Sequence, residues 1–155
     1  MVTSGPVPTI RSAGTDDLAG IQAIEWEQFS HLAYPYFVLR QLFELHGTDW
    51  TVAEFEGRVC GYVLTAISAE RCAWFLGFAV AGHCRGRGFG RNLLEAALEH
   101  CRKARADRVF VTVRPDNRTA YRLYEDVGFV RSDHEAAYFG RDEPRDVLVH
   151  KLYHC

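Results

Sequence analysis

Apolar residues recur every three or four positions in the first part of the chain, a spacing that predicts two amphipathic helices. The first is expected to follow an N-cap at Thr15 and to run to about Phe29. Pro35 separates the two helices, because a proline disfavours helix in the residue before it. The second helix is expected over Phe37–His46, with Gly47 as its C-cap.

The remaining apolar positions follow a strand pattern, interrupted by two more helices. The helices are expected from the end of a glycine-rich loop to about Ala104 and over Asn117–Val127, where Gly128 ends the second. The expected strands are Thr9–Ala13, Trp50–Phe55, Val59–Ile67, Arg71–Val80, Val109–Val113, Phe129–Tyr138 and Val147–Leu152. Arg71–Val80 and Val109–Val113 are continuous apolar runs, so we expect each to be buried on both faces of a sheet. The order is β-α-α-β-β-β-α-β-α-β-β.

Composition is that of one ordinary globular domain over residues 1–155. The 18 Lys and Arg residues against 20 Asp and Glu residues give a net charge of −2, which argues against a general nucleic-acid partner. No apolar stretch reaches the length of a membrane span, and the N-terminus lacks the pattern of a secretory signal. We therefore expect a cytoplasmic protein with no membrane partner.

The chain has five cysteines and no Cys-x-x-Cys pair, so neither a disulfide framework nor a zinc module is indicated. We expect no metal and mostly packed free thiols, at Cys60, Cys72, Cys84, Cys101 and Cys155. Cys84 precedes Arg85 at the start of a helix, where a lowered thiol pKa would permit an acyl-cysteine route. No His-Asp arrangement accompanies it, and a packed thiol is the preferred interpretation.

A loop rich in glycine and arginine, Arg85-Gly86-Arg87-Gly88-Phe89-Gly90-Arg91, lies between a predicted strand and a helix. Free backbone N–H groups and the helix dipole make such a helix start an anion site, and glycines let a ligand approach the backbone. Three arginines around one turn would repel one another without an anion. The loop lacks the Gly-Lys-Ser/Thr of a nucleotide P-loop and the Gly-x-Gly-x-x-Gly of a dinucleotide fold. The sequence therefore predicts a site for a phosphate or a pyrophosphate of another kind.

This loop fits Arg/Gln-x-x-Gly-x-Gly/Ala, and the segment from Asn117 to Phe129 provides a second characteristic stretch about 30 residues later. Together they resemble the GCN5-related N-acetyltransferase (GNAT) superfamily over nearly the whole chain. The resemblance implies an α/β fold with a mixed, largely antiparallel sheet of six to seven strands and helices on both faces. It also implies acetyl-CoA as cosubstrate. The cofactor-binding residues it implies are Phe78, Ala79, Val80, Arg85, Gly86, Arg87, Gly88, Phe89, Gly90, Arg91, Asn117 and Tyr124.

The resemblance further implies transfer of an acetyl group to a primary amine by direct attack, with Tyr124 as the acid that protonates the leaving thiolate. By spacing alone Tyr124 fits a core position, since it lies on the apolar stripe of its helix. Related enzymes often place Glu or His where this chain has Thr112, whose hydroxyl cannot serve as a base near neutral pH. Other candidates for the base are Glu25, Glu27, Glu70, His83, His134 and Tyr138. The residues do not choose among them.

The acceptor is expected between residues 26–37 and 134–144, which contain several aromatic side chains. The end of the chain resembles ribosomal-protein-alanine and protein N-terminal acetyltransferases, although Thr112 departs from their pattern. A peptide N-terminus and a small-molecule amine both remain open, as does a homodimer. An α-amine, with a pKa near 7.7 to 8.0, is more often neutral at pH 7 than a lysine and suits a site without a strong base better. The alternative is an acetyl-CoA-binding sensor or pseudo-enzyme without turnover.

Overall fold

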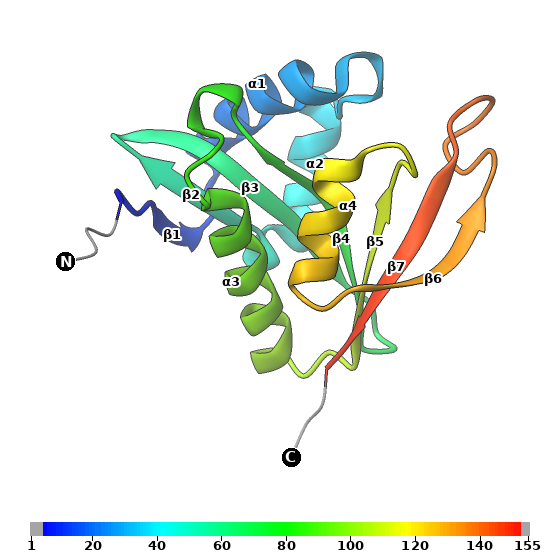
Figure 1. The fold of residues 1–155 in the computed structure, drawn as a ribbon. Coiled ribbons are helices and arrows are strands. Elements are labelled where there is room, and N and C mark those ends of the chain that lie inside the picture. Colours follow the sequence, from blue (N-terminus) through cyan, green and yellow to red (C-terminus); the bar gives the residue numbers. More distant parts are fainter. Residues whose placement is uncertain (1–4, 153–155) are drawn as a thin grey trace.

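A seven-stranded sheet forms the centre of the computed structural model, which describes residues 5–152 (Figure 1). Its strand order is β1-β2-β3-β4-β5-β7-β6. The strands are β1 (Thr9–Ser12), β2 (Thr51–Phe55), β3 (Arg58–Ile67), β4 (Cys72–Val80), β5 (Arg108–Val113), β6 (Val130–Glu135) and β7 (Arg145–Lys151). The α-helices are α1 (Leu18–Phe29), α2 (Tyr36–His46), α3 (Phe89–Lys103) and α4 (Arg118–Asp126). The predicted order of elements is confirmed.

Neighbouring strands are antiparallel except for β4 and β5, which pair in parallel. The helices lie on both faces of this mixed sheet, with α3 and α4 in front of it and α1 and α2 behind it in Figure 1. Two neighbours on β3 show the division. The hydroxyl of Tyr62 reaches Glu25 of α1, whereas a Cβ on Gly61 would meet Leu93 of α3. The expected fold class is therefore confirmed.

The expectation that β4 and β5 are buried on both faces is wrong. Their burial alternates: Ala73 and Phe75 of β4 are buried, while Trp74 between them is partly exposed and stacks on Phe110 of β5 at a ring-centroid distance of 4.8 Å. Val109, Val111 and Val113 of β5 are buried and alternate with partly exposed residues. The second face of these strands is apolar but only partly covered.

Several element ends differ from their predicted positions. The residues from Thr15 to Asp17 form a 3₁₀ turn before α1, in which the Asp17 carboxylate accepts the Gly14 N–H at 2.7 Å and pairs with Arg11. Phe129 lies in the core instead of opening a strand, and β6 ends at Glu135 instead of Tyr138. The last strand begins two residues before the predicted Val147. Cys155 lies outside the described residues.

Candidate active site

The parallel strands β4 and β5 pair only at one end. Their register covers Cys72–Trp74 with Arg108–Phe110, although β4 continues to Val80 and β5 to Val113. On its other side β4 stays paired with β3 as far as Val80. The edge of β4 that faces β5 therefore offers unpaired backbone groups beyond Trp74 within the described chain. Such an edge can bind an extended, amide-containing ligand as an added strand.

We call the gap between β4 and β5 beyond Trp74 the split. It coincides with a β-bulge in β4. Leu64 of β3 pairs with Gly77 and Thr65 pairs with Phe75, so Leu76 is an extra residue. The carbonyl oxygen of Leu76 accepts a hydrogen bond from the Tyr34 hydroxyl at 2.9 Å. Tyr34 lies in the break between α1 and α2, two residues before α2 begins, so this bond fastens the start of α2 to the bulge.

The glycine loop that follows β4 has the backbone geometry of an anion cradle. Gly86 and Gly88 have φ of +78° and +79°, values that favour glycine, and a Cβ at either position would meet nothing within 4 Å. Gly88 is the N-cap of α3 and makes no side-chain cap, so the first N–H groups of that helix are left for a ligand. Gly90 serves packing instead, because its Cβ would lie 3.1 Å from Leu123 of α4.

Each loop arginine contacts a different partner. The expectation that the three arginines would repel one another without an anion therefore does not hold. Arg85 is hydrogen-bonded to Gln28 of α1, and the Arg87 guanidinium lies over the Phe55 ring at 5.1 Å from its centroid. Arg91 pairs with Glu95 one turn along α3 at 3.0 Å. The free glycine backbone, and not charge repulsion, is the stronger argument for an anion here.

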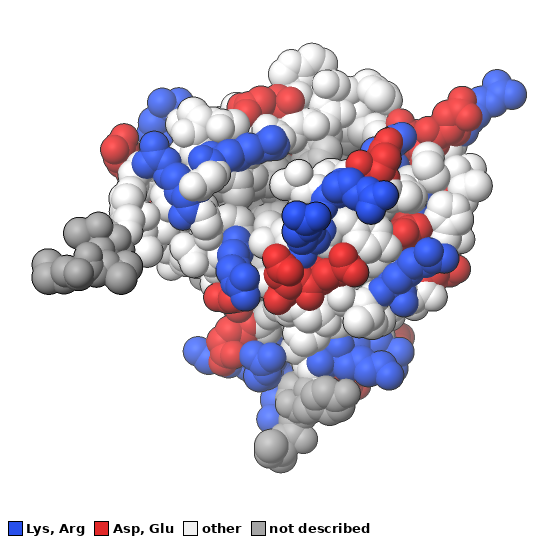
Figure 2. Space-filling view, in the orientation of Figure 1, with Lys and Arg blue, Asp and Glu red and all other residues white. Residues whose placement is uncertain are grey.

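Figure 2 shows further basic side chains over α4, across a hollow from those around the loop. Arg118 and Arg122 line a small pocket on this helix, and no acidic partner is assigned to either within the described chain. They add positive charge on the second side of the hollow. Asn117 is the N-cap of α4, where its Oδ1 accepts the Ala120 N–H at 3.2 Å. Its side-chain amide nitrogen is free for a ligand.

Tyr124 points from α4 to the split. The residue is 5% exposed, and its ring packs on Phe78 of β4 at a centroid distance of 5.9 Å and on Phe129 at 5.7 Å. Burial raises the pKa of the Tyr124 hydroxyl, which therefore stays protonated and can donate. Tyr124 therefore occupies the core position that its helical spacing predicted, and its ring packs on β4 at Phe78.

Glu25 is a buried carboxylate on the other face of the sheet, 2% exposed. It accepts the Tyr62 hydroxyl at 2.5 Å on Oε1 and the Tyr34 N–H at 2.9 Å on Oε2. A Cβ on Gly77 would lie 3.4 Å from Oε1, so the carboxylate faces β4 beside the bulge. Burial raises the pKa of Glu25, although both hydrogen bonds oppose that effect. A carboxylate with a raised pKa is better matched to proton transfer near neutral pH than an ordinary one.

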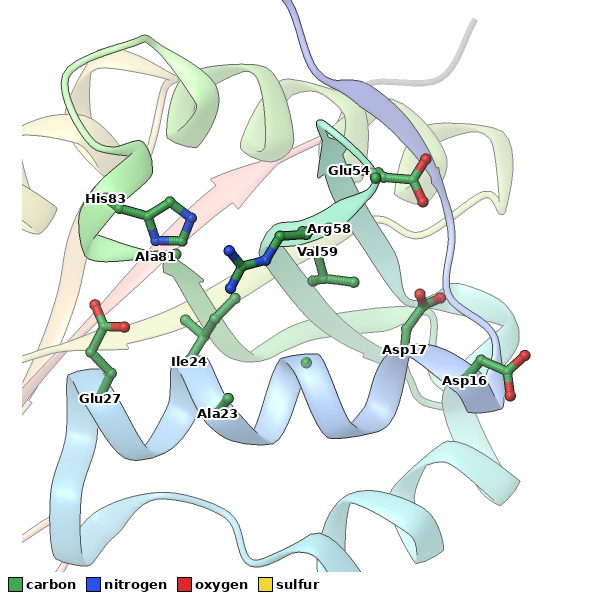
Figure 3. A pocket seen from close by; sticks show the side chains of 12 residues that line it. Asp16, Asp17, Ala23, Ile24, Glu27, Glu54, Arg58, Val59, Ala81 and His83 are labelled. Carbon is green, nitrogen blue, oxygen red and sulfur yellow. The ribbon is translucent and has the colours of Figure 1, made fainter.

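Two other candidate bases, Glu27 and His83, face a different pocket, of about 440 Å³, between α1 and the β2–β3 hairpin. Figure 3 shows both at one end of it, and the Arg58 side chain reaches from the hairpin toward α1 between its walls. Glu27 accepts the Gly82 N–H at 2.7 Å and so supports the turn before the glycine loop. This pocket is separate from the split, so Glu27 and His83 do not lie at the split.

The remaining candidates are dispersed. Glu70 is exposed in the turn before β4, at the end opposite to the glycine loop. His134 lies on the edge strand β6, where its Nδ1 contacts the buried Asp146 at 2.7 Å. Tyr138 lies beyond β6 near Tyr34, whose pKa is raised to about 12 by burial, by Glu25 and by Tyr138. Thr112 is partly exposed on β5 opposite Val147.

Nothing in the sequence indicated that Tyr62 belongs to the site as the hydrogen-bond donor to Glu25. It stands in the middle of an apolar strand pattern, and its role depends on Glu25, which lies 37 residues earlier.

Within residues 5–152 no cluster of three or more His, Cys, Asp or Glu side chains could hold a metal ion. In the same range no helix is long and apolar enough to cross a membrane.

Comparisons with known proteins identify the family of the chain. A family model described as Acetyltransferase (GNAT) family matches residues 18–129. An uncharacterized N-acetyltransferase of Methanocaldococcus jannaschii is 30% identical over 121 residues, which cover 77% of this chain and 76% of that protein. An N-alpha-acetyltransferase of Saccharolobus solfataricus is 25% identical over 156 residues, 93% of each chain.

Two solved structures share the fold. Ard1 from Thermoplasma volcanium has a TM-score of 0.88 and 24% identity over 96% of this chain and 100% of its own. Arabidopsis thaliana Naa50 in complex with the bisubstrate analogue CoA-Ac-MVNAL has a TM-score of 0.82 and 16% identity over 95% of this chain and 100% of its own. The family match covers well over half of the chain, and with the divided sheet and the glycine loop it places this protein in the GNAT family, as an N-acetyltransferase.

Proposed function

We propose that the protein transfers the acetyl group of acetyl-CoA to the α-amine of a peptide or protein N-terminus. The observation that carries this proposal is the meeting of three features at one point of β4. The strand edge is unpaired there, the Tyr124 ring packs on Phe78 from one face, and the Glu25 carboxylate faces Gly77 from the other. An acetyl donor in the split would lie between an acid and a base.

The residues of the split and loop fit acetyl-CoA. Its pantetheine arm contains two amides, which the backbone groups of Phe78, Ala79 and Val80 would pair with as an added strand. The N–H groups from Gly86 to Arg91 would bind the pyrophosphate, because Gly86 and Gly88 leave the space before the loop open. Asn117, with its free amide, would contact the arm as it passes α4. The thioester supplies the activated acetyl group.

The side chains then divide the proton transfers. Glu25 accepts the proton that the amine loses, through a water molecule, since the carboxylate is nearly fully buried. A backbone N–H of the unpaired β4 edge donates to the carbonyl oxygen as negative charge develops on it. Tyr124 donates its hydroxyl proton to the sulfur as the carbon–sulfur bond breaks. Tyr62 and the Tyr34 N–H hold Glu25 in place.

The α-amine is favoured as acceptor for two reasons. A carboxylate base suits an amine that is already partly neutral at pH 7, which is true of α-amines and not of lysine. One relative is named as an N-alpha-acetyltransferase, and the analogue bound by Naa50 joins CoA to a peptide. Exposed aromatic side chains, Phe29, Tyr36 and Phe139 among them, border the expected entrance and would contact the first residues of a peptide. No observation favours the sensor without turnover.

The proposal is tested by mixing the protein with acetyl-CoA and short peptides with free N-termini, and by measuring thiol release together with peptide mass. We expect one acetyl group on a peptide for each thiol released. Tight CoA binding without acetylation of any peptide or small amine would overturn the enzymatic proposal. Acetylation of small amines alone would overturn the choice of acceptor.

Replacing Tyr124 with phenylalanine is expected to lower kcat by up to about a hundredfold and to leave CoA affinity within a few-fold. The ring would still pack on Phe78 and Phe129, and the CoA thiolate is already a fair leaving group because its pKa is near that of a cysteine thiol, about 8.5. The measurement is single-turnover kinetics, with Tyr121→Phe on the same helix as control. Tyr121 instead donates to the Asp146 carboxylate of β7 at 2.8 Å. An unchanged rate of the chemical step in Tyr124→Phe would leave Tyr124 a purely structural role.

A further inference from the structure

Two cysteine side chains meet directly behind the glycine loop. Cys60 lies on β3 and is 1% exposed, and Cys84 lies in the 3₁₀ turn Gly82–Cys84 and is 3% exposed. Both are free thiols in the structure. Neither has a part in the proposed transfer, and the turn that carries Cys84 leads straight into Arg85.

Backbone hydrogen bonds bring the two residues together. The Ala81 N–H donates to the Cys60 carbonyl oxygen at 2.8 Å, and the Cys84 N–H donates to the Ala81 carbonyl oxygen at 2.9 Å. The Cys60 thiol donates to the Ala53 carbonyl oxygen at 3.3 Å, and a hydrogen bond with the Cys84 thiol contributes to its raised pKa. Ala81 thus acts as the bridge between β3 and the turn.

Both thiols are buried, and burial makes the Cys60 thiol unreactive. Burial raises the pKa of Cys60 to about 11, and the neighbouring Cys84 thiol adds to the rise. The thiolate is the reactive form, so burial protects Cys60 from oxidation. The charge of Arg87 acts in the opposite direction on the Cys60 pKa. Arg87 belongs to the glycine loop, so protection of the thiols and anion binding involve the same segment.

We propose that Cys60 and Cys84 form a redox modification site that couples the oxidation state of the thiols to the shape of the glycine loop. When the turn opens, a hydroperoxide oxidises the Cys84 thiolate to a sulfenic acid, and one oxygen of the peroxide leaves as water or alcohol. The Cys60 thiol then condenses with the sulfenic acid. A sulfur–sulfur bond forms and a water molecule leaves, so two thiols are oxidised and one peroxide is reduced.

The disulfide would alter the loop because its geometry is narrow. A sulfur–sulfur bond of about 2.05 Å draws two side chains closer than any non-bonded contact allows. The turn would be pulled toward β3, and the N–H groups of the loop would be displaced from the positions that bind a pyrophosphate. This consequence rests on the proposed function. By thermodynamic reciprocity, CoA bound to the loop must disfavour formation of the disulfide to the same extent.

The test uses the whole protein with Cys72→Ser, because trypsin otherwise leaves Cys72 and Cys84 in one peptide. The protein is treated with hydrogen peroxide, digested without reductant and examined by mass spectrometry for a peptide pair joined through Cys60 and Cys84. We expect this pair to form, to disappear in Cys60→Ser and in Cys84→Ser, and to form more slowly when CoA is present. CoA affinity, measured by calorimetry, should fall at least tenfold on oxidation and recover with dithiothreitol.

Absence of the joined peptides, or bonds involving only Cys101, would overturn the proposed site. A Cys60–Cys84 bond that leaves CoA affinity unchanged would overturn the coupling. If the reduced protein fails to bind CoA at all, the proposed function is at fault, and the joined peptides still decide whether the two thiols react. The readouts for the two proposals are therefore separate.

Discussion

Replacing Gly88 with valine is expected to abolish CoA binding while the fold persists. The residue has a φ of +79°, and the space that its Cβ would enter is open. A valine side chain there would stand in front of the N–H groups at the start of α3, and its backbone would resist the left-handed conformation. For the parent, CoA at a hundred times its Kd should stabilise the fold by about 2.7 kcal/mol, a rise in Tm of roughly 5 to 10 °C. The variant should show no rise.

The matched control for this experiment is Gly57→Val in the β2–β3 turn. Gly57 has a φ of +76° and an equally open Cβ position, so valine brings a similar backbone strain away from the loop. Both variants should lose similar stability, and only Gly88→Val should lose CoA. Gly88→Ala serves as a milder second variant. Undiminished CoA affinity in a folded Gly88→Val protein would mean that the donor binds elsewhere.

Replacing Glu25 with glutamine is expected to lower kcat by about a hundredfold or more, the effect of removing a positioned base. Glutamine keeps the size of the side chain and an oxygen that can accept from Tyr62 or Tyr34, so the local structure should remain. In the parent the rate should rise with pH through the raised pKa of Glu25, since the charged form is the base. The variant should lack this part of the pH profile. The measurement is single-turnover kinetics across pH.

As pH rises, the contribution of Glu25 to folding stability should fall, whereas its contribution to the rate should rise. The pKa of Glu25 is raised by burial above its ordinary value of 4.5, so the carboxyl is favourable in the fold below that value. That contribution is lost as pH rises through the folded pKa. Glu25→Gln should therefore be at least as stable as the parent at pH 8, and the difference should shrink toward pH 4. The control is Glu44→Gln on the exposed side of α2, which should change neither property. A parent-like kcat in Glu25→Gln would exclude Glu25 as the base.

The sequence predicts the arrangement of elements well because local signals are strong here. The glycine of the β2–β3 turn, the capping Asn117 and the helical spacing of α3 each act within a few residues of one another. It predicts the glycine loop for the same reason, since the positive φ of Gly86 and Gly88 is a local requirement.

The chemistry of β4 could not be read in the same way. An apolar run is equally consistent with a strand covered on both faces and with one that borders a split, and the sequence cannot show that pairing with β5 stops at Trp74. Glu25 could be named as a candidate base but not chosen, because what distinguishes it is burial and a bond from Tyr62 on another element. Such properties arise only when distant segments pack together.

One peptide that carries both a free N-terminal α-amine and an internal lysine decides which amine the protein acetylates. The peptide is incubated with the protein and acetyl-CoA at pH 7, and fragmentation in the mass spectrometer locates the acetyl group. At this pH the neutral fraction of an α-amine exceeds that of lysine by about a hundredfold or more. We predict acetylation at the N-terminus, with one thiol released for each peptide modified. Acetylation at lysine alone, or no acetylation of any amine by a protein that binds acetyl-CoA, would show that the protein is not an N-terminal acetyltransferase.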